Sequence, residues 1–420
     1  MKREVVITGI GIVSPIGIGR DAFWDALDNG RSGISEYAPL ASARDVPYRL
    51  AGLYKDFDAK QYVQPRKTIK VMCREIQSAY AAAMIAMQDA GLVKDQFDPA
   101  RLGVVLGSEM FYGEMEELID SSCASIQDGV FHANEWNPVA MKNLFPLWML
   151  KYLPNMPACH IGIVNDARGP NNTIVQGGTS SLLAMQEATM CIERGHADVM
   201  ISGGSGARIT FGGAPFRGWQ QLSLWQGPPE EAIKPFDRRR DGGVWGEGAG
   251  LLVLESREHA ERRGAKILAR IAGFSSRNEP GTGNHKLTGS AIRSSISAAL
   301  KSAEMQPSDI GHVNANAGGF VDLDRVEAQA IHAELGEVPV TAPKSYFGDL
   351  GGSTGAVELC ASLLAFQHGR VPRTLNYQEP DPQCPVNVVR DASLPVEKLT
   401  ALVLSQNEHG GAAALVLAAV

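Results

Sequence analysis

A short β-rich run, a tight turn and a long apolar helix follow one another in the stretch NTIVQGGTSSLLAMQEATMCIERGHADVMISGG, residues 172–204. In an enzyme with this order of elements the turn often presents a nucleophile, because the free N–H groups that begin the helix stabilise an anion. The residue expected to carry that nucleophile here is Gly178, which has no side chain. The nearest hydroxyl groups belong to Thr179 and Ser180. The chain has therefore either lost its reagent or moved it to another side chain.

Strands and amphipathic helices alternate along the chain and must position this turn. Strands are predicted at residues 3–13, 101–108, 172–176, 197–204 and 248–256, and again at 312–318, 339–343, 398–407 and 412–420. Helical patterns occupy residues 68–91 and 289–305, each closed by glycine or proline signals. This alternation predicts an α/β protein with mostly parallel sheets that helices cover on both faces.

Residues 177–195 and 351–369 repeat one pattern at identical spacing. Each begins with two glycines and a hydroxyl residue at the helix start, continues as a nearly all-apolar helix and closes at a glycine. A helix that is apolar on every side is buried. The match indicates two duplicated halves packed back to back. A chance match between two common Gly-Gly caps is the alternative.

The composition excludes several classes of function. The 420 residues, 44% apolar and 20% charged, are typical of a soluble globular protein with a large core. A net charge of -7 argues against a general affinity for nucleic acid or for an anionic membrane. The basic run Arg238–Arg240 is interpreted as solvated surface.

The cysteines and the N-terminus favour a cytoplasmic protein. Six scattered cysteines with no CxxC pair fit a reducing cytosol better than a disulfide framework or a zinc site. The opening MKREVVITGIGIVSP resembles a signal peptide only superficially, because glycines and Pro15 interrupt its apolar run, so a buried strand is predicted. No apolar run is long enough to cross a bilayer.

Several ordered motifs resemble those of the β-ketoacyl-acyl-carrier-protein synthases, or ketosynthases. They are VVITGIGIVSPIG, PFDRRRDGGVWGEGAG, VNANAGGFVDLDRVEAQAI, APKSYFGDLGGSTGA and NEHGGAAA, and the similarity runs from Lys2 to Val420. The resemblance implies a thiolase-like fold, an α-β-α-β-α five-layer sandwich of two duplicated halves, placed here at residues 1–255 and 256–420. It also implies dimers whose central sheets join across the interface. Acyl chains would arrive on the phosphopantetheine of an acyl carrier protein, with no other cofactor.

The departures from the family's motifs fall on its three reagents. Ketosynthases attack the acyl thioester with a cysteine and use two histidines in the decarboxylation of malonyl-carrier protein. The resemblance places Gly178, Asn316 and Asp349 at these positions, and Lys344 and Glu327 in the same pocket. Glycine cannot form a thioester, asparagine has no relevant proton to exchange, and aspartate brings negative charge where carboxylate loss needs positive stabilisation. The chain is therefore predicted to be inactive in condensation.

A second alignment puts Gln176 at the position of the cysteine. The inactive partner of a polyketide ketosynthase, the chain-length factor, often carries glutamine there, and related loading domains use it in decarboxylation. That alignment spoils the match of the following helix, whose register fixes which faces are buried, so Gly178 is preferred. Neither alignment leaves a nucleophile.

The C-terminal turn raises the possibility that chemistry has moved. Where the family has two phenylalanines, one of which gates acyl entry, this chain has Asn407 and His409, with Glu408 between them. On the implied fold, Glu408 and His409 would converge with Asn316 and Asp349 on one polar pocket.

Such a pocket has two interpretations. An Asp–His pair acting on Thr179 or Ser180 would make a hydrolase-like or acyltransferase-like site. In the other interpretation the pocket is dead, and its polar residues satisfy one another and bound water. A metal site at Asp349 and His409 is a lesser alternative, which no ligand spacing supports.

Two more segments bear on acyl chains and their carrier. Bulky residues follow the strand at 101–108, where the family lines its acyl tunnel with an open, glycine-rich stretch. They would narrow the chain's own tunnel or reach the partner's, unless they are ordinary core aromatics; they are Met110, Phe111 and Tyr112. Arg66, Lys67 and Lys70 resemble the family's basic region for docking an acidic carrier protein, although a solvated helix face is equally consistent with them.

Three functions follow, in order of preference. The first is a catalytically silent ketosynthase homologue that pairs with an active ketosynthase, as a chain-length factor does, in type II polyketide or specialised fatty-acid biosynthesis. The second is an enzyme with repurposed acyl chemistry (acyltransferase, thioester hydrolase or decarboxylase) that uses His409, Asp349 and the hydroxyls near Thr179. The third is a homodimeric acyl-binding or regulatory protein without turnover.

Overall fold

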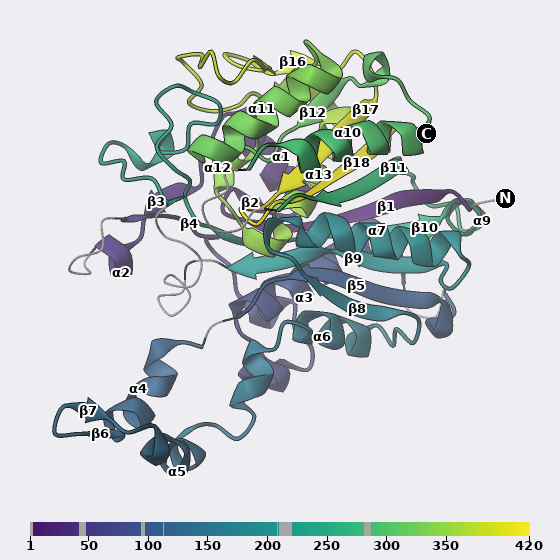
Figure 1. Cartoon of the computed structure of the whole chain (residues 1–420). Helices are drawn as coiled ribbons and strands as arrows, with labels where there is room; N and C mark the ends of the chain where they lie inside the picture. Colours follow the sequence, from purple (N-terminus) through teal and green to yellow (C-terminus); the bar gives the residue numbers. More distant parts are fainter. Residues whose placement is uncertain are drawn as a thin grey trace.

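The computed structural model describes residues 3–41, 48–93, 97–111, 113–207, 209, 221–280 and 287–420 (Figure 1). Its long strands belong to one hydrogen-bonded network of twelve strands, which divides into two sheets. The division falls between β1 (Val5–Ser14) and β11 (Ala269–Asn278), which pair only where Val6 and Ile7 oppose Arg270 and Ala269.

The first half of the chain builds a sheet in the order β8-β5-β9-β10-β1. Besides β1, its strands are β5 (Leu102–Ser108), β8 (Asn171–Val175), β9 (Val199–Ala207) and β10 (Glu247–Ser256). The pairs β8–β5 and β5–β9 are parallel, whereas β9–β10 and β10–β1 are antiparallel. β8 is the last strand, so its outer edge has no neighbour among the described strands.

The second half repeats this arrangement in the order β13-β12-β17-β18-β11, with the short β15 (Asn387–Val388) added beyond β13. Its other strands are β12 (His312–Asn314), β13 (Pro339–Thr341), β17 (Thr400–Gln406) and β18 (Gly411–Ala418). Two parallel pairs are again followed by two antiparallel pairs. The repeat of pairing confirms the predicted duplication.

The expectation of mostly parallel sheets is wrong for half of these pairs. The short turn that joins β17 to β18, residues 407–410, shows why. A turn of this length can join only antiparallel neighbours, since a parallel pair needs a long crossover connection.

Helices occupy three layers around and between the two sheets. α3 (Arg74–Asp89) and α6 (Met156–Val164) pack on the outer face of the first sheet, and α10 (Ser290–Ala303) and α11 (Val321–Leu335) form the opposite outer layer. α7 (Ser180–Glu193) and α13 (Thr354–His368) lie between the sheets, because each contacts strands of both halves. The result is the α-β-α-β-α five-layer sandwich, and α13 is buried at every residue from Thr354 to Ala365.

The two central helices begin in the same way, as the repeated pattern predicts. A 3₁₀ turn precedes each of them, η5 (Gly177–Thr179) before α7 and η9 (Gly351–Ser353) before α13. The first residue of each turn has a positive φ, 57° at Gly177 and 63° at Gly351, which glycine adopts at little cost.

Short elements complete the fold. They are β2 (Gly17–Ile18), α1 (Arg20–Asp28), β3 (Ile34–Glu36), α2 (Ala38–Ala41), β4 (Leu50–Gly52), η1 (Ala59–Gln61), η3 (Pro99–Arg101), η7 (Pro229–Glu231), α9 (Arg257–Arg262), η8 (Pro307–Asp309), α12 (Lys344–Phe347), β14 (Arg370–Val371) and β16 (Leu394–Pro395). The six cysteines are free. No helix in the described ranges is both long enough and apolar enough to cross a bilayer.

The helix predicted at residues 68–91 is two elements instead of one. A 3₁₀ helix, η2 (Arg66–Val71), ends before Met72 and Cys73, which are extended, and α3 starts at Arg74. Met72 is buried in an apolar cluster with Val63 and Phe111. We attribute the break to the burial of Met72, because a continuous helix would point successive side chains in other directions.

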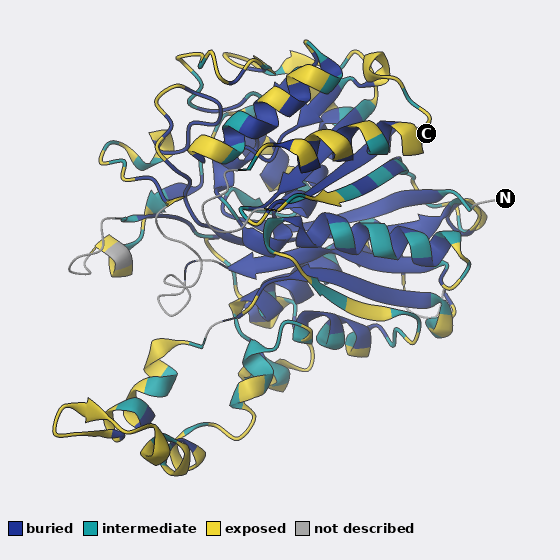
Figure 2. Ribbon diagram, in the orientation of Figure 1, coloured by how far each residue is buried: buried dark blue, intermediate teal, exposed yellow. Residues whose placement is uncertain are grey.

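The segment 113–153, which we call the arm, projects from the layered body (Figure 1). It contains α4 (Met115–Cys123), β6 (Ile126–Gln127), β7 (Val130–Phe131), α5 (Ala133–Asn143) and η4 (Trp148–Tyr152). Most of its residues are exposed (Figure 2). The arm was not predicted from the sequence. The helices of the arm carry apolar side chains on faces that no other described part of the chain covers.

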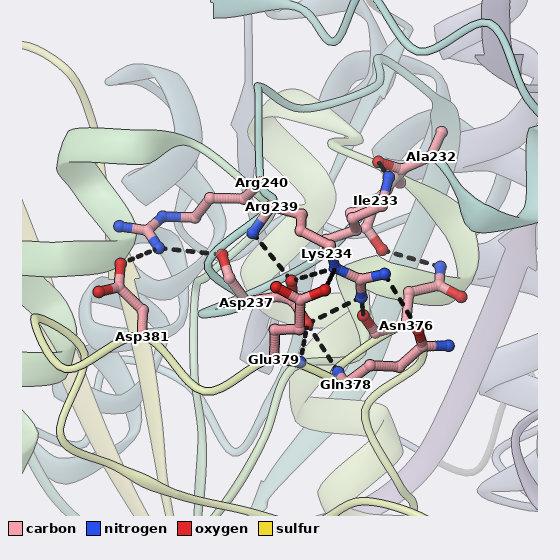
Figure 3. A network of polar contacts seen from close by, with 10 residues as sticks. All are labelled: Ala232, Ile233, Lys234, Asp237, Arg239, Arg240, Asn376, Gln378, Glu379 and Asp381. Carbon is pink, nitrogen blue, oxygen red and sulfur yellow. Dashed lines mark hydrogen bonds and ion pairs between the residues drawn. The ribbon is translucent and has the colours of Figure 1, made fainter.

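The basic run Arg238–Arg240 is not simply solvated surface, because two of its arginines join the halves (Figure 3). Arg240 is buried and donates to Asp381 at 2.6 Å and to the Val321 carbonyl at 3.1 Å. Arg239 donates to Asp237, whose carboxylate also accepts the backbone N–H groups of residues 378 and 379. Burial acts to raise the pKa of Asp237, but these hydrogen bonds lower it to about 2.

We predict that Arg240→Ala destabilises the protein by about 3 kcal/mol, because it removes one partner of a buried ion pair. The neighbouring Arg238 is exposed, and Arg238→Ala, as the matched control, should change the free energy of unfolding by less than about 0.5 kcal/mol. Urea denaturation of both variants at one protein concentration measures the difference. Equal losses in the two variants would show that the Arg240 contacts do not hold the halves together.

Candidate functional site

A small cavity lies where the α7 turn, the loop after β12 and the C-terminal turn meet. Gly178, Asn316, Lys344, Asp349 and Glu408, all expected in the pocket, line it. Its other lining residues are Gln221, Trp245, Phe320, Leu323 and Gln406. We call it the inner cavity. The space open to the centre of a water molecule is ≈ 20 Å³, which suits a single water.

The Gly178 turn is fixed by a hydrogen bond from β17. The Gly178 carbonyl accepts the Ser405 hydroxyl at 2.7 Å. A Cβ atom added at Gly178 would lie 3.0 Å from the Gln406 carbonyl oxygen and would meet no other atom within 4 Å. A Cβ atom here therefore requires the Gln406 carbonyl to move by a few tenths of an ångström.

The two hydroxyls after Gly178 are engaged in closing the turn. Thr179 Oγ1 donates to the Gln176 carbonyl at 2.8 Å. Ser180 Oγ donates to the Gly177 carbonyl at 2.7 Å and accepts the Gln176 N–H at 2.8 Å. Hydroxyls bound to backbone groups in this way stabilise the start of a helix. Neither of them is oriented toward a general base.

A buried polar network forms one wall of the inner cavity. Lys344 Nζ donates to Asn316 Oδ1 at 2.6 Å and to the Asn316 carbonyl, and it lies 3.6 Å from Glu358 Oε1. The Asn316 N–H donates to Glu327 Oε1 at 2.7 Å. Burial, the dominant cause, raises the pKa of both Glu327 and Glu358 to about 8. Asn316 is thus committed as an acceptor for Lys344, and its amide has no proton to exchange.

Asp349 fixes the turn that precedes the second central helix. Its Oδ1 accepts the Gly351 N–H at 3.0 Å and the Thr354 hydroxyl at 3.1 Å. A carboxylate is favourable at this end of a helix, where N–H groups are unpaired. Its backbone also bridges to residues 244 and 246. Asp349 therefore has a structural role and brings negative charge to the cavity.

The expected convergence of His409 with these residues is wrong. The His409 side chain is 81% exposed and lies 3.6 Å from Glu408. Asn407 causes this placement, because its Oδ1 accepts the N–H groups of His409 and Gly411 at 3.0 Å each and closes a turn that directs His409 outward. Glu408 lines the inner cavity, whereas Asn407 donates to the Gln176 carbonyl at 3.1 Å.

Among the described residues, the groups expected to form a new catalytic centre do not come together. The hydroxyl-bearing Thr179 lines a different cavity, together with Gln176, while His409 faces the exterior. Among the described residues, no group of three His, Cys, Asp or Glu side chains is placed to hold a metal ion. The metal alternative at Asp349 and His409 has no geometry to support it, since the first fixes the turn before α13 and the second is exposed.

The remaining predicted residues lie outside the inner cavity. Gln176 is exposed, so the inner cavity meets Gly178 and not Gln176. Phe111 is buried in a core cluster, Met110 is 56% exposed, and Tyr112 lies outside the described residues. The basic residues of η2, namely Arg66, Lys67 and Lys70, are exposed.

Three residues at the site were not predicted from the sequence: Phe320, Trp245 and Glu358. Phe320 and Trp245 line the inner cavity, and Glu358 pairs with Lys344. A signal for Phe320 was present in the sequence, because it directly follows Gly318 and Gly319, and paired glycines allow a ring to pack closely on backbone. Glu358 had a signal too, as the one acidic residue within the apolar helix 354–365.

Comparison with known families gives two matches that together cover most of the chain. Residues 2–260 match the β-ketoacyl synthase N-terminal domain, and residues 268–378 match the β-ketoacyl synthase C-terminal domain. A putative polyketide β-ketoacyl synthase 1 of Streptomyces halstedii is 34% identical, over 99% of this chain and 98% of that protein. The 3-oxoacyl-[acyl-carrier-protein] synthase 2 of Vibrio cholerae is 33% identical, over 98% and 97%.

Solved structures agree with these matches. One is a type II polyketide synthase acyl-carrier protein in complex with its ketosynthase bound to the hexaketide, with a TM-score of 0.84 and 29% identity over 100% of both chains. Another is the ishigamide ketosynthase/chain length factor, with a TM-score of 0.86 and 27% identity over 100% of both chains.

The raised pKa of Glu327 predicts a pH dependence of stability. Its pKa rises from an ordinary value of 4.5 to about 8 on folding, so the folded protein binds more protons between these values and the free energy of unfolding falls as pH rises through them. Glutamine cannot titrate. Between pH 5 and pH 8, the free energy of unfolding of Glu327→Gln should therefore rise relative to that of the wild type by more than about 1 kcal/mol.

Denaturant titrations at several pH values measure this difference. The exposed Glu397 provides the matched control, and Glu397→Gln should run parallel to the wild type across the range. A Glu327→Gln profile that also runs parallel would mean that Glu327 is ionised at neutral pH in the folded protein.

Proposed function

The chain belongs to the β-ketoacyl synthase family, and we propose that it serves there as a catalytically silent subunit paired with an active ketosynthase, as a chain-length factor does. The observation that carries this proposal is the inner cavity. Gly178, Asn316 and Asp349, which the resemblance assigns to the positions of the family's reagents, line it, and its ≈ 20 Å³ is too small for an acyl chain. With no nucleophile and no space for substrate, condensation must take place on another subunit.

Exposed apolar side chains support pairing with a second subunit. Twelve of the eighteen exposed large apolar residues described in the chain fall between Met110 and Val175, a segment that holds the arm, α6 and β8. Examples are Met141 at 79% and Ile163 at 78%. A concentration of this kind marks an interaction surface, since monomeric proteins rarely expose large apolar patches.

The open edge of β8 supports the same proposal. An unpaired edge strand is a template for pairing with another chain, and natural proteins usually protect it. Thr173 Oγ1 on β8 and His160 Nε2 on α6 are buried without a hydrogen-bond partner. The ketosynthase-type partner we propose would extend the sheet across this edge and cover the arm. Residues near Met110 would then border the partner's acyl tunnel and limit its length.

The repurposed-enzyme alternative gains no support from the geometry. It needs His409 near a free hydroxyl, but His409 is exposed and the hydroxyls of Thr179 and Ser180 bind backbone carbonyls. A homodimer that binds acyl chains without turnover would have to hold them outside the inner cavity. Both alternatives are outcomes of the experiments below.

We predict that co-expression with a ketosynthase that has an intact Cys-His-His triad, encoded beside this chain, gives a 1:1 complex by native mass spectrometry. Acyl groups should appear by mass spectrometry on the partner's cysteine and not at the turn of this chain, because Gly178 has no side chain to carry them. An acyl adduct in the inner cavity of this chain, or a homodimer that excludes the partner, contradicts the proposal.

Charge introduced on the arm should prevent that complex. Phe131 is 52% exposed, and Phe131→Glu with Met141→Glu places two carboxylates in the proposed apolar interface. Leu399, which is 48% exposed and lies outside this segment, provides the matched control as Leu399→Glu. Native mass should show loss of the complex for the arm variant and an intact complex for the control. Retention of the complex by the arm variant places the interface elsewhere.

Charge reversal in η2 tests whether a carrier protein docks there. Arg66→Glu with Lys70→Glu should slow association of the 1:1 complex with an acidic holo-carrier protein by about tenfold at low salt, with a smaller effect at high salt. The exposed Lys301, on α10, is the matched control as Lys301→Glu. Stopped-flow binding measures the rates. Equal rates for both variants would leave η2 a solvated face.

A further inference from the structure

A second cavity lies directly in front of the inner one. Its volume is ≈ 310 Å³, measured in the same way as the ≈ 20 Å³ of the inner cavity. It is large enough for part of a phosphopantetheine group. We call it the outer cavity. The two share Gln221, Phe320, Leu323 and Glu408 as lining residues. These four residues therefore border both cavities, and we call them the partition.

Phe320 is the largest side chain of that partition, and its position is closely defined. A Cβ atom added at Gly243 would lie 2.3 Å from the Phe320 Cζ atom, and one added at Gly318 would lie 3.1 Å from its Cε2 atom. The same point at Gly318 is 3.1 Å from the Lys344 Cδ atom. The ring thus lies on a glycine floor beside the aliphatic stem of Lys344, whose ammonium group belongs to the polar wall behind it.

The backbone that carries Phe320 is held on both sides of the ring. Before it, the N–H groups of Gly318 and Gly319 donate to the Asp324 carboxylate at 3.1 and 3.0 Å. After it, the Val321 carbonyl accepts Arg240 at 3.1 Å. Asp324 is fully buried and also accepts the Phe236 N–H at 3.1 Å. Phe320 therefore stands on a fixed support, and the partition does not open with a free loop.

We propose that Phe320 is a plug that seals the inner cavity, so that the thioester end of a carrier-bound chain can enter the outer cavity but cannot reach the Gly178 turn. The identity of the excluded ligand rests on the proposed function, whereas the plug itself rests on the two cavities. Its effect would be on specificity. A silent subunit that cannot hold the chain does not compete with the active subunit for it.

The negative charge of the residues that line the outer cavity also disfavours entry of the carrier-bound ligand. Asp241, Asp322 and Glu408 line it, and their carboxylates repel the phosphate of an incoming phosphopantetheine group and the carboxylate of any malonyl group that it carries. Asp322 is partly neutralised by Arg325, 3.2 Å away. The plug therefore provides the steric barrier, and these groups make the approach less favourable.

A reporter cysteine at the turn tests the plug. Gly178→Cys places a thiol on the inner side of the partition with only the 3.0 Å contact to Gln406 to relieve. Bromoacetyl-pantetheine, whose bromide the thiolate displaces, is the probe. Mass spectrometry measures how fast the introduced thiol is modified, relative to the exposed native Cys123. We expect slow modification in Gly178→Cys and an increase of about tenfold or more when Phe320→Ala is added.

Leu287→Ala is the matched control, because Leu287 lines the outer cavity and not the inner one. Added to Gly178→Cys, it enlarges the outer cavity without opening the partition and should leave the rate within about twofold. If Phe320→Ala lowers the melting temperature enough to expose the turn by unfolding, Phe320→Met keeps a side chain that is flexible, and an intermediate rate is expected.

Two results would overturn the plug: a Phe320→Ala rate no higher than that of Gly178→Cys alone, or an equal increase with Leu287→Ala. The experiment uses the isolated subunit and measures no turnover. Failure of the plug would therefore not contradict the proposed 1:1 complex with an active ketosynthase. An acyl adduct on the wild-type chain would contradict the proposed function but not the position of the Phe320 ring.

Discussion

The structure around the inner cavity depends on one buried carboxylate, that of Asp324. It is fully buried, and it accepts three backbone N–H groups, from Phe236 in the first half and from Gly318 and Gly319 in the second. Burial raises its pKa, and those N–H groups together with nearby Arg240 act to lower it. One side chain thus fixes the segment that carries Asn316 and Phe320 and ties it to the motif that joins the halves. An apolar residue of similar size has no acceptor and would leave those N–H groups unsatisfied.

The polar groups around the inner cavity are held by hydrogen bonds within the fold. The Gly178 turn, the bond from Ser405 and the helix behind them belong to the packing of the central layer. Asn316 accepts a hydrogen bond from Lys344, and Asp349 accepts the Gly351 N–H in the turn before α13. Each of these side chains satisfies neighbouring polar groups and so has a structural role.

Much of the fold could be predicted from the sequence, because it follows from local patterns. The buried strands, the two Gly-Gly turns and the all-apolar central helices all carry periodic signals. The duplicated pairing of the two sheets and the five layers agree with them. The antiparallel pairs were missed because strand direction depends on connection length, which strand patterns do not reveal.

The site was predicted less completely, for physical reasons that differ from residue to residue. Gly178, Asn316, Lys344, Asp349 and Glu408 meet as expected, since each follows a strand or begins a helix at one edge of the layers. His409 does not, because a side-chain hydrogen bond from its neighbour Asn407 sets the turn and no strand or helix period does. The arm escaped prediction because its apolar faces are not buried within this chain. Helical periodicity identifies a face but not the molecule that covers it.

The buried group of Lys344, Glu358 and Glu327 beside the inner cavity invites the conclusion that the site is catalytic, but electrostatics provides a sufficient structural reason for this group. All three are buried. Lys344 lies close to Glu358 and donates to Asn316, whose backbone N–H donates to Glu327. Removing one member of such a group leaves a charge or a polar atom uncompensated and destabilises the fold by several kcal/mol. Replacing all of them by apolar residues avoids this loss but requires simultaneous changes on three elements. A nucleophile on a turn has no such support. On the proposed function, stability alone accounts for the buried network, so the network is weaker evidence for catalysis than the missing side chain at Gly178 is against it.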